Sequence, residues 1–218
     1  MGAVPSESDP TRSGRGPYRK GVRRRQEIVQ AATEVFAEVG YNGGSLRSIS
    51  ERVGVSSALL VQYFGTKEGL LAAVLEEWAR QSRPAGAAGL RGVAWVRSIR
   101  DAMAYNSTHR GLVELFLSLT TETSNPAHPA RPFIQQRYAS VIAELDRHLR
   151  EAVSDGDVHL DDDQIEREVR LFVAAMDGIE LQWLLDARVD VLDLFDHHLS
   201  STLARWARPQ GQRGLTAS

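Results

Sequence analysis

The chain has 218 residues, 42% of them hydrophobic and 25% charged, which is the composition of an ordinary globular protein with enough apolar material for a sizeable core. Cysteine is absent, so the chain offers no disulfides, thiolate metal ligands or cysteine nucleophiles. No apolar segment follows the first charges, and no stretch of about 18 apolar residues is free of charge, so we expect neither a secretory signal nor a membrane span. These features predict a cytoplasmic protein of one or two domains.

The formal net charge of −2 hides an asymmetry between the two parts of the chain. Residues 1–83 carry 12 Arg and Lys against 9 Asp and Glu, whereas residues 84–218 carry 14 against 19. Seven basic side chains and no acid fall within residues 12–25. A basic end on a mildly acidic body suggests a polyanion as the partner of that end, and a solvated tail is the alternative.

The first 82 residues divide into an arm and four helices. Residues 1–21 are rich in Pro, Gly, Ser and Arg without periodic apolar positions, which predicts a disordered basic arm. A first helix follows, with apolar residues at helical spacing, and ends near Gly40. Ser45, Ser56 and Thr66 can cap three further helices, which are expected over 46–52, over 57–64 and from residue 67 onward.

The rest of the chain also has the periodicity of helices. Residues 83–92 mark a weak boundary, and three prolines within 125–132 require a loop. The expected helices cover 93–106, 109–123, 132–154, 162–187 and 191–207, before a frayed tail over 208–218. We find no convincing β-strand. The pattern therefore predicts an all-α protein, with a small domain over 22–82 and a larger one over 93–207.

Residues 45–64 are the most informative segment, because two short helices meet there at a glycine. Gly54 can adopt the left-handed backbone that such a turn needs. The positions where the two helices would pack together are apolar: Ile49, Val53, Val55, Leu60 and Phe64. This spacing is typical of a helix-turn-helix, in which the first helix crosses the DNA backbone and the second enters the major groove.

The surrounding residues, 23–80, resemble the TetR family of bacterial transcriptional repressors. A basic amphipathic helix ending in Gly-Tyr precedes the stretch SLRSISERVGVSSALLVQYFGTKEGLL. The positions in register with the family pattern are Phe36, Gly40, Ile49, Gly54, Val55, Ser56, Phe64, Lys67, Glu68 and Leu70. The resemblance implies an all-α homodimer with an N-terminal DNA-binding domain and a larger C-terminal ligand-binding and dimerisation domain. It implies a repressor that binds an inverted-repeat operator and is released by a small molecule.

The motif departs from the family pattern at its reading helix. Ala58 stands where the family often has Gly, and Val61, Gln62 and Tyr63 replace an aromatic pair followed by His. Val61 cannot donate a hydrogen bond to a phosphate, so the operator of a relative cannot be transferred to this chain. The C-terminal half resembles the choline-responsive branch of the family over 125–129, 137–138 and 176–185, without implying choline as the ligand.

We expect the DNA contacts to come from the motif and from the basic start of the first helix. Gln62 can read adenine through two hydrogen bonds, and Tyr63 can donate to a phosphate. Lys67 begins a helix, where the dipole disfavours a cation, and a phosphate partner would explain it. Solvated arginines and a simple N-cap at Ser56 are the alternatives. The candidate set is Arg23, Arg24, Arg25, Arg47, Ser56, Ser57, Ala58, Gln62, Tyr63 and Lys67.

The C-terminal half offers residues for an effector pocket. The set is Trp95, Met103, Asn106, Phe116, Tyr138, Phe172, Met176, Asp177, Glu180 and Trp183, with Asn106, Asp177 and Glu180 as polar anchors. We favour core or interface packing for most of the aromatic residues, and a paired or wetted dimer-interface position for Asp177 and Glu180. If a carboxylate faces the pocket, the effector is a largely apolar molecule with an amine or hydroxyl.

The last two helices carry more apolar residues than a single core-facing stripe needs. The set is Phe172, Val173, Met176, Leu181, Leu184, Leu185, Leu192, Leu194, Phe195, Leu199, Leu203 and Trp206. The surplus predicts a second buried face, and the resemblance implies that two helices from each subunit form a four-helix bundle there.

Catalytic and metal-binding patterns are missing from the sequence. His197 and His198 are adjacent and point to different faces of a helix, and Asp161–Asp163 stand where a helix begins rather than at the spacing of a calcium loop. Neither a nucleophile elbow nor a phosphate-binding glycine loop is visible. We therefore expect no enzymatic activity, no metal and no cofactor. The rival interpretations are a ligand-independent DNA-architectural protein and an enzyme with an incidental helical hairpin.

Overall fold

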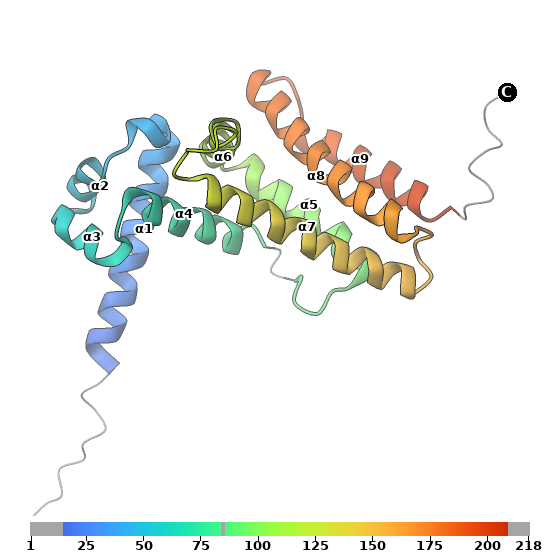
Figure 1. The fold of residues 1–218 in the computed structure, drawn as a ribbon, viewed down its shortest axis with the longest axis horizontal. Helices are drawn as coiled ribbons and strands as arrows, with labels where there is room; N and C mark the ends of the chain where they lie inside the picture. Colours follow the sequence, from blue (N-terminus) through green and yellow to red (C-terminus); the bar gives the residue numbers. More distant parts are fainter. Residues whose placement is uncertain (1–14, 84–85, 209–218) are drawn as a thin grey trace, which may run out of the picture.

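The computed structural model describes residues 15–83 and 86–208, and every regular element in these ranges is an α-helix (Figure 1). The all-α prediction is confirmed, and the expected helices after residue 45 end within one or two residues of the observed bounds. The elements are α1 (Arg15–Gly43), α2 (Leu46–Val53), α3 (Ser57–Phe64), α4 (Lys67–Gln81), α5 (Gly92–Ser107), α6 (Arg110–Glu122), α7 (Arg131–Ser154), α8 (Asp162–Leu185) and α9 (Val191–Trp206).

The first helix is longer than the sequence pattern indicates. It begins at Arg15, so residues 15–21 are helical, and only residues 1–14 of the expected arm lie outside the described residues. The composition was misleading because Pro17 stands in the first turn, where its missing N–H costs no intrahelical hydrogen bond. The expected break at Gly40 is present, with φ 70° and ψ 174°. Most of the expected frayed tail, residues 209–218, also lies outside the described residues.

Side-chain caps begin the helices where the sequence predicts them. Ser45 and Ser48 form a capping box at α2, and the side chains of Ser56 and Thr66 accept hydrogen bonds from backbone N–H groups of α3 and α4. Asp161 caps α8 in a second capping box with Gln164, which confirms capping as the role of this aspartate. These caps satisfy N–H groups that a helix start leaves without partners.

Two buried clusters form the core, and they do not divide the chain where its composition changes. The first cluster joins α1–α4 with α6 and the start of α7, whereas the second joins α5, α7, α8 and α9. Figure 1 shows α1–α4 at one end of the molecule and α8 and α9 as a neighbouring pair at the other. The boundary near residues 83–92 is therefore a boundary along the chain, while α6 belongs by packing to the core of the N-terminal helices.

Small residues let α6 approach α1 closely. A Cβ atom added at Gly111 would lie 2.6 Å from the Cβ of Ala37, a distance that real Cβ atoms do not show. Arg110, one residue earlier, donates hydrogen bonds to the backbone oxygens of Trp183 (3.2 Å) and Leu184 (2.5 Å) at the end of α8. The start of α6 therefore connects α1 to the end of α8.

Helix α4 is largely buried and ends the N-terminal group of helices. Leu70, Leu71, Val74, Leu75 and Trp78 are all buried on it. Within the described ranges no single helix is long and apolar enough to cross a membrane, although α3 and α4 together, bent by 66°, meet that criterion by length and composition.

A buried hydrogen-bond chain links α4, α5 and α8. Trp78 Nε1 donates to Asn106 Oδ1 at 3.0 Å, and Asn106 Nδ2 donates to Glu180 Oε1 at 2.7 Å. Glu180 is only 4% exposed, and this burial raises the pKa of its carboxyl to about 7, with the charge of Asp177 acting in the same direction. The bond from Asn106 and the charge of Arg137 lower that pKa without reversing the effect of burial.

Replacing this carboxyl by an amide tests the burial. A folded-state pKa of about 7, above the usual 4.5, means that Glu180 makes the protein lose stability as pH rises from about 4.5 to about 7. We expect Glu180→Gln to match wild type near pH 5 and to be more stable by about 2–3 kcal/mol at pH 8, measured by urea unfolding. Glu166→Gln on the exposed side of α8 is the control. A pH-independent difference between wild type and Glu180→Gln contradicts the expectation.

Candidate nucleic-acid interface and effector cavity

The turn between α2 and α3 has the geometry that the sequence predicts. Gly54 adopts the left-handed conformation, with φ 70° and ψ 40°, and its N–H bonds to the backbone oxygens of Glu51 and Ser50. Ile49 and Leu60 are fully buried between the helices and the rest of the domain. This packing leaves one side of α3 free to face outward.

A serine pair joins the two helices where they cross. Ser50 Oγ donates to the backbone oxygen of Arg47 at 2.8 Å and lies 2.9 Å from Ser57 Oγ. Because the hydroxyl proton of Ser50 is already used, Ser57 donates to Ser50. The half-buried Ser57, which the sequence places among the DNA contacts, therefore serves the packing of α2 on α3 in this structure.

Four residues form the outer surface of α3, and we call them the reading face: Ser56, Ala58, Val61 and Gln62. All four are exposed, and Val61 exposes 49% of its surface. Val61 is not among the predicted DNA contacts, because its side chain cannot donate a hydrogen bond. An exposed apolar side chain between Ala58 and Gln62 is nevertheless suited to contact the methyl group of thymine. The sequence feature that could have indicated this contact is an apolar residue on the outer side of the predicted reading helix.

Tyr63 and Lys67 lie beside the reading face and are both partly covered. A Cβ added at Gly21 of α1 would lie 3.6 Å from the Tyr63 hydroxyl, which places that hydroxyl next to α1. Lys67 Nζ lies 4.2 Å from the centre of the Tyr41 ring, and burial lowers the pKa of the Lys67 ammonium. The Tyr41 hydroxyl in turn donates to Glu68 at 2.8 Å. These contacts hold Lys67 at the start of α4.

The predicted arginines are helical but do not open their helix. Because α1 starts at Arg15, Arg23–Arg25 stand inside it, which corrects the expectation that three cations crowd a helix start. Inside a helix they meet no N-terminal dipole, and Arg23 and Arg24 pair with Glu27 at 3.4 and 2.8 Å. Arg25 lies 5.2 Å from the centre of the Phe64 ring.

Arg47 of α2 pairs with Glu51 one turn later, at 2.9 Å, and both side chains are exposed. An exposed pair of this kind contributes little to stability, so Arg47 can exchange its partner for a phosphate at small cost.

A hollow of about 370 Å³ lies among α5, α7, α8, the end of α4 and the segment before α5, and we call it the inner cavity. Three of the predicted pocket residues line it: Trp95, Asn106 and Met176. Trp95 stacks on His148, with ring centroids 4.1 Å apart and an interplanar angle of 13°. The wall of the cavity thus includes the stacked rings of Trp95 and His148 and several aliphatic side chains.

The other predicted pocket residues do not line the inner cavity. Met103 and Phe172 are core residues with 0% and 1% exposure, and Phe116 packs against Trp78 and Tyr138. Trp183 lies under the guanidinium of Arg110. Helical spacing correctly predicts that these residues lie on apolar faces of their helices, but it does not reveal which neighbour covers each face.

The two carboxylates also turn away from the inner cavity. Glu180 is bound to Asn106 in the core, so it faces neither a ligand nor a surface available to a second subunit. Asp177 accepts a hydrogen bond from the Tyr138 hydroxyl at 2.6 Å and lines a separate surface hollow between α6, α7 and α8. The structure therefore removes the basis for an effector selected by Asp177 or Glu180 in this cavity.

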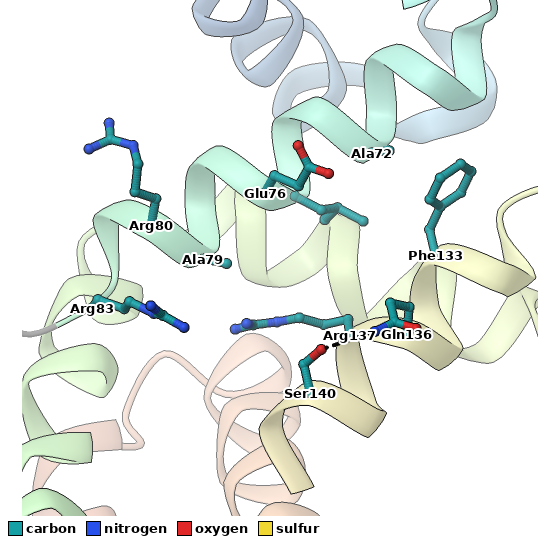
Figure 2. A pocket seen from close by; sticks show the side chains of 10 residues that line it. Ala72, Glu76, Ala79, Arg80, Arg83, Phe133, Gln136, Arg137 and Ser140 are labelled. Carbon is teal, nitrogen blue, oxygen red and sulfur yellow. Dashed lines mark hydrogen bonds between the residues drawn. The ribbon is translucent and has the colours of Figure 1, made fainter. Parts of the chain in front are cut away.

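Two arginines at the wall of the cavity are not among the predicted pocket residues. Arg83 and Arg137 line the inner cavity and also a groove of about 460 Å³ between α4 and α7, shown in Figure 2, which we call the outer groove. The signal for Arg137 is its place on α7, four residues before Val141 and eight before Leu145, on a side that is otherwise apolar.

The surplus apolar surface of the last two helices is smaller than the sequence indicates and differs in detail. Phe172, Phe195 and Trp206 are buried inside the subunit. The exposed large hydrophobic residues of α8 and α9 are Leu171 (61%), Leu181 (47%), Leu185 (79%) and Leu194 (38%). Between Leu171 and Leu181, a Cβ added at Gly178 would meet nothing within 4 Å. We call the four leucines with Gly178 the outer leucine face.

A short helix-turn-helix with an exposed reading face, followed by a helical domain with an inner cavity, defines the chain as a helix-turn-helix regulatory protein. Residues 28–74 match the family model described as bacterial regulatory proteins, tetR family. This match identifies the N-terminal helices as the DNA-binding domain of the TetR family of transcriptional regulators.

Named relatives agree with this assignment in the N-terminal part. The chain is 36% identical over 105 residues to the HTH-type transcriptional repressor AcnR of Corynebacterium diphtheriae, covering 46% of this chain and 53% of that protein. It is 38% identical over 71 residues to the regulator BetI of Cronobacter sakazakii, covering 33% of this chain and 35% of that protein. The matches thus span from a third to half of the relatives' length.

Solved structures extend the likeness of fold to the C-terminal part. A TetR-family regulator from Rhodococcus sp. aligns with a TM-score of 0.73 at 19% identity, covering 86% of this chain and all of that one. The regulator tylp from Streptomyces fradiae aligns with a TM-score of 0.65 at 25% identity, covering 87% and 89%. The whole described fold is that of the family.

The junction between α3 and α4 can be tested through Gly69. A Cβ there would lie 2.1 Å from the backbone oxygen of Phe64, the last residue of α3. Helix propensity alone favours Ala over Gly by about 1 kcal/mol, so the sign of the effect separates the two contributions. We expect Gly69→Ala to lower the free energy of unfolding by about 1–3 kcal/mol in urea titrations. Gly86→Ala, where a Cβ meets open space, is the control. Stabilisation by Gly69→Ala would contradict the close contact.

Proposed function

We propose that this protein is a transcriptional repressor that binds an inverted-repeat operator as a homodimer and leaves it when a small molecule binds the C-terminal domain. The observation that carries the proposal is the reading face of α3, which stands clear of the rest of the subunit beside a lysine and exposed arginines. The family assignment supports it, because the relatives are named as transcriptional repressors and regulators.

The reading face has the chemistry of a helix in the major groove. Gln62 supplies the donor and acceptor pair that matches adenine, and Val61 and Ala58 supply apolar contacts for thymine methyl groups. Lys67 and Arg47 stand at its sides as phosphate partners, which position the protein without reading sequence. Two copies of α3 about 34–36 Å apart would meet successive major grooves on one side of the duplex.

The outer leucine face supports the homodimer. Its four leucines expose more than a third of their surface each, and no charged residue interrupts the outer side of α8 from Leu171 through Ala174 and Gly178 to Leu185. Three exposed residues of α9, His197, Ser201 and Ala204, follow Leu194 at helical spacing. Packing α8 and α9 on their symmetry copies removes this apolar surface from water.

The inner cavity supports control by a small molecule. Its size falls in the range of ligand pockets, and its wall includes Ala79, Ser82 and Arg83 at the end of α4. Since α4 follows α3 after Gly65 and Thr66, a ligand that shifts α4 also shifts the reading face. Regulators of similar fold bind stearoyl-CoA in one structure and choline in another, two molecules of unlike chemistry, so these relatives select no effector class for this chain. Coupling of about 1–3 kcal/mol is sufficient, and operator DNA must weaken effector binding by the same factor.

Operator binding is tested by selecting duplexes from a random pool and measuring affinities by gel shift. We expect Gln62→Ala to lose about 1–3 kcal/mol of binding free energy on the selected site and little on scrambled DNA. Lys67→Ala should weaken binding to both duplexes alike and reduce the salt dependence by about one phosphate contact. Arg97→Ala, which removes an exposed cation from α5, is the control. Equal wild-type affinity for selected and scrambled duplexes contradicts a sequence-specific repressor and favours an architectural protein.

The dimer is tested by placing charges on the outer leucine face. We expect wild type to have the mass of a dimer in light scattering at micromolar concentration. The double variant Leu181→Arg, Leu185→Arg should be a folded monomer, because four arginines cannot be desolvated at one interface. Leu90→Arg, a charge at an exposed leucine outside α8 and α9, should remain dimeric. A monomeric wild type, or a dimeric double variant, overturns this assignment of the interface.

A further inference from the structure

The guanidinium of Arg137 lies beside an aromatic ring and has no hydrogen-bond acceptor among the described residues. Its guanidinium carbon lies 5.8 Å from the centre of the Trp78 ring, and within residues 15–83 and 86–208 it makes no hydrogen bond or ion pair. The ring covers one side of the guanidinium, but the planar fork of N–H groups at its edge is left for another partner. Burial is the largest influence on Arg137 and lowers the pKa of its guanidinium. A half-buried arginine in this condition is poised to bind an anion.

A second arginine faces it. Figure 2 shows the side chains of Arg83 and Arg137 pointing toward each other across the outer groove, one from the end of α4 and the other from α7. Their repulsion also lowers the pKa of Arg137. Arg83 is exposed and lies 3.6 Å from Glu144, a looser pair than the bidentate contacts elsewhere on the surface. Glu144 is thus the carboxylate that pairs with Arg83, whereas Glu144 and Glu180 act on Arg137 only through longer-range attraction.

The other charged side chains around the two hollows leave Arg137 without a carboxylate in contact with it. Glu180 is engaged by Asn106, and Arg147 is paired with Glu151 at 2.8 Å. Glu76 lines the outer groove on the α4 side and is exposed. Arg83 and Arg137 both line the inner cavity and the outer groove, so the two cations stand where these hollows meet.

We propose that the effector of this protein is an organic anion, with a carboxylate or phosphate head group bound by Arg137 and Arg83 and an apolar body in the inner cavity. The assignment rests on the proposed function and replaces the amine or hydroxyl expected from the sequence. The wall beyond Arg137 suits an apolar body, because it is formed by Trp95, Ile99, Ala102, Val141 and Met176. An anion between the two arginines removes their repulsion and offers acceptors to both planar forks.

The same head group links the effector to the reading face. Arg83 follows the last turn of α4, and Arg137 lies in the middle of α7. An anion that binds both draws the end of α4 toward α7, whereas the empty site leaves two like charges that push these elements apart. The head group, rather than the apolar body, is then the part of the effector that moves α4.

The test compares three ligands that differ only in the charge of the head group: decanoate, decanol and decylamine. Binding to the full chain without DNA is measured by calorimetry, at concentrations where the ligands are monomeric, and decyl phosphate distinguishes phosphate from carboxylate. We expect wild type to bind an anionic member more tightly than decanol and decanol more tightly than decylamine. Arg137→Gln should lose about 10- to 100-fold in affinity for the anions and keep its affinity for decanol, which also shows that the cavity is intact. Arg97→Gln, which removes an exposed arginine that lines neither the inner cavity nor the outer groove, should behave as wild type.

The outcomes separate this inference from the proposed function. Tighter binding of decylamine, equal affinities for all ligands, absence of anion binding at millimolar concentration, or an unchanged preference in Arg137→Gln each overturns the anionic effector. Operator binding by the same wild-type preparation is measured in parallel on selected and scrambled duplexes. A protein that binds its operator but prefers the amine retains the proposed function and loses this inference, whereas failure on the operator overturns the proposed function itself.

Discussion

The hydrogen-bond chain from Trp78 through Asn106 to Glu180 is the constraint on which the arrangement of the helices depends. It joins α4, α5 and α8 inside the core, where a polar group without a partner costs about 1–3 kcal/mol. Each side chain is the hydrogen-bond partner of the next, so a shift of one helix along another would break a buried hydrogen bond. Burial of the Glu180 carboxyl also makes this point sensitive to the proton, because the pKa of the group is raised to about 7.

Helix α4 passes this constraint on to the reading face. Its start approaches α3 so closely that Gly69 admits no Cβ, its middle is fixed by Trp78, and its end supplies Arg83 to the inner cavity. A helix fixed at its middle and in contact with a cavity at one end can transmit a displacement to the other end. The proposed anion between Arg83 and Arg137 acts on the end that lies at the cavity.

Helix α6 explains why the two domains behave as one packed unit. Gly111 allows its start to lie on α1, and Arg110 binds the last backbone oxygens of α8, next to the outer leucine face. The surfaces proposed for DNA and for the second subunit are therefore connected through a single helix start. A change in the angle between subunits would reach α1, and through it the motif, without crossing the loop at residues 83–92.

Interactions between residues close together in the sequence allowed most of the helices to be predicted from the sequence alone. Caps such as Ser45, Ser56 and Asp161, with glycines at Gly40 and Gly54, mark where helices begin and end, because the interactions they make span only a few residues. The helix-turn-helix is readable for the same reason. The inner cavity and its arginines were decided only by the tertiary structure, since Asn106 finds Glu180 across 74 positions and Arg137 meets Arg83 from another helix. Periodicity shows that a helix has an apolar side, but only packing decides whether a neighbour, a ligand or a second subunit covers it.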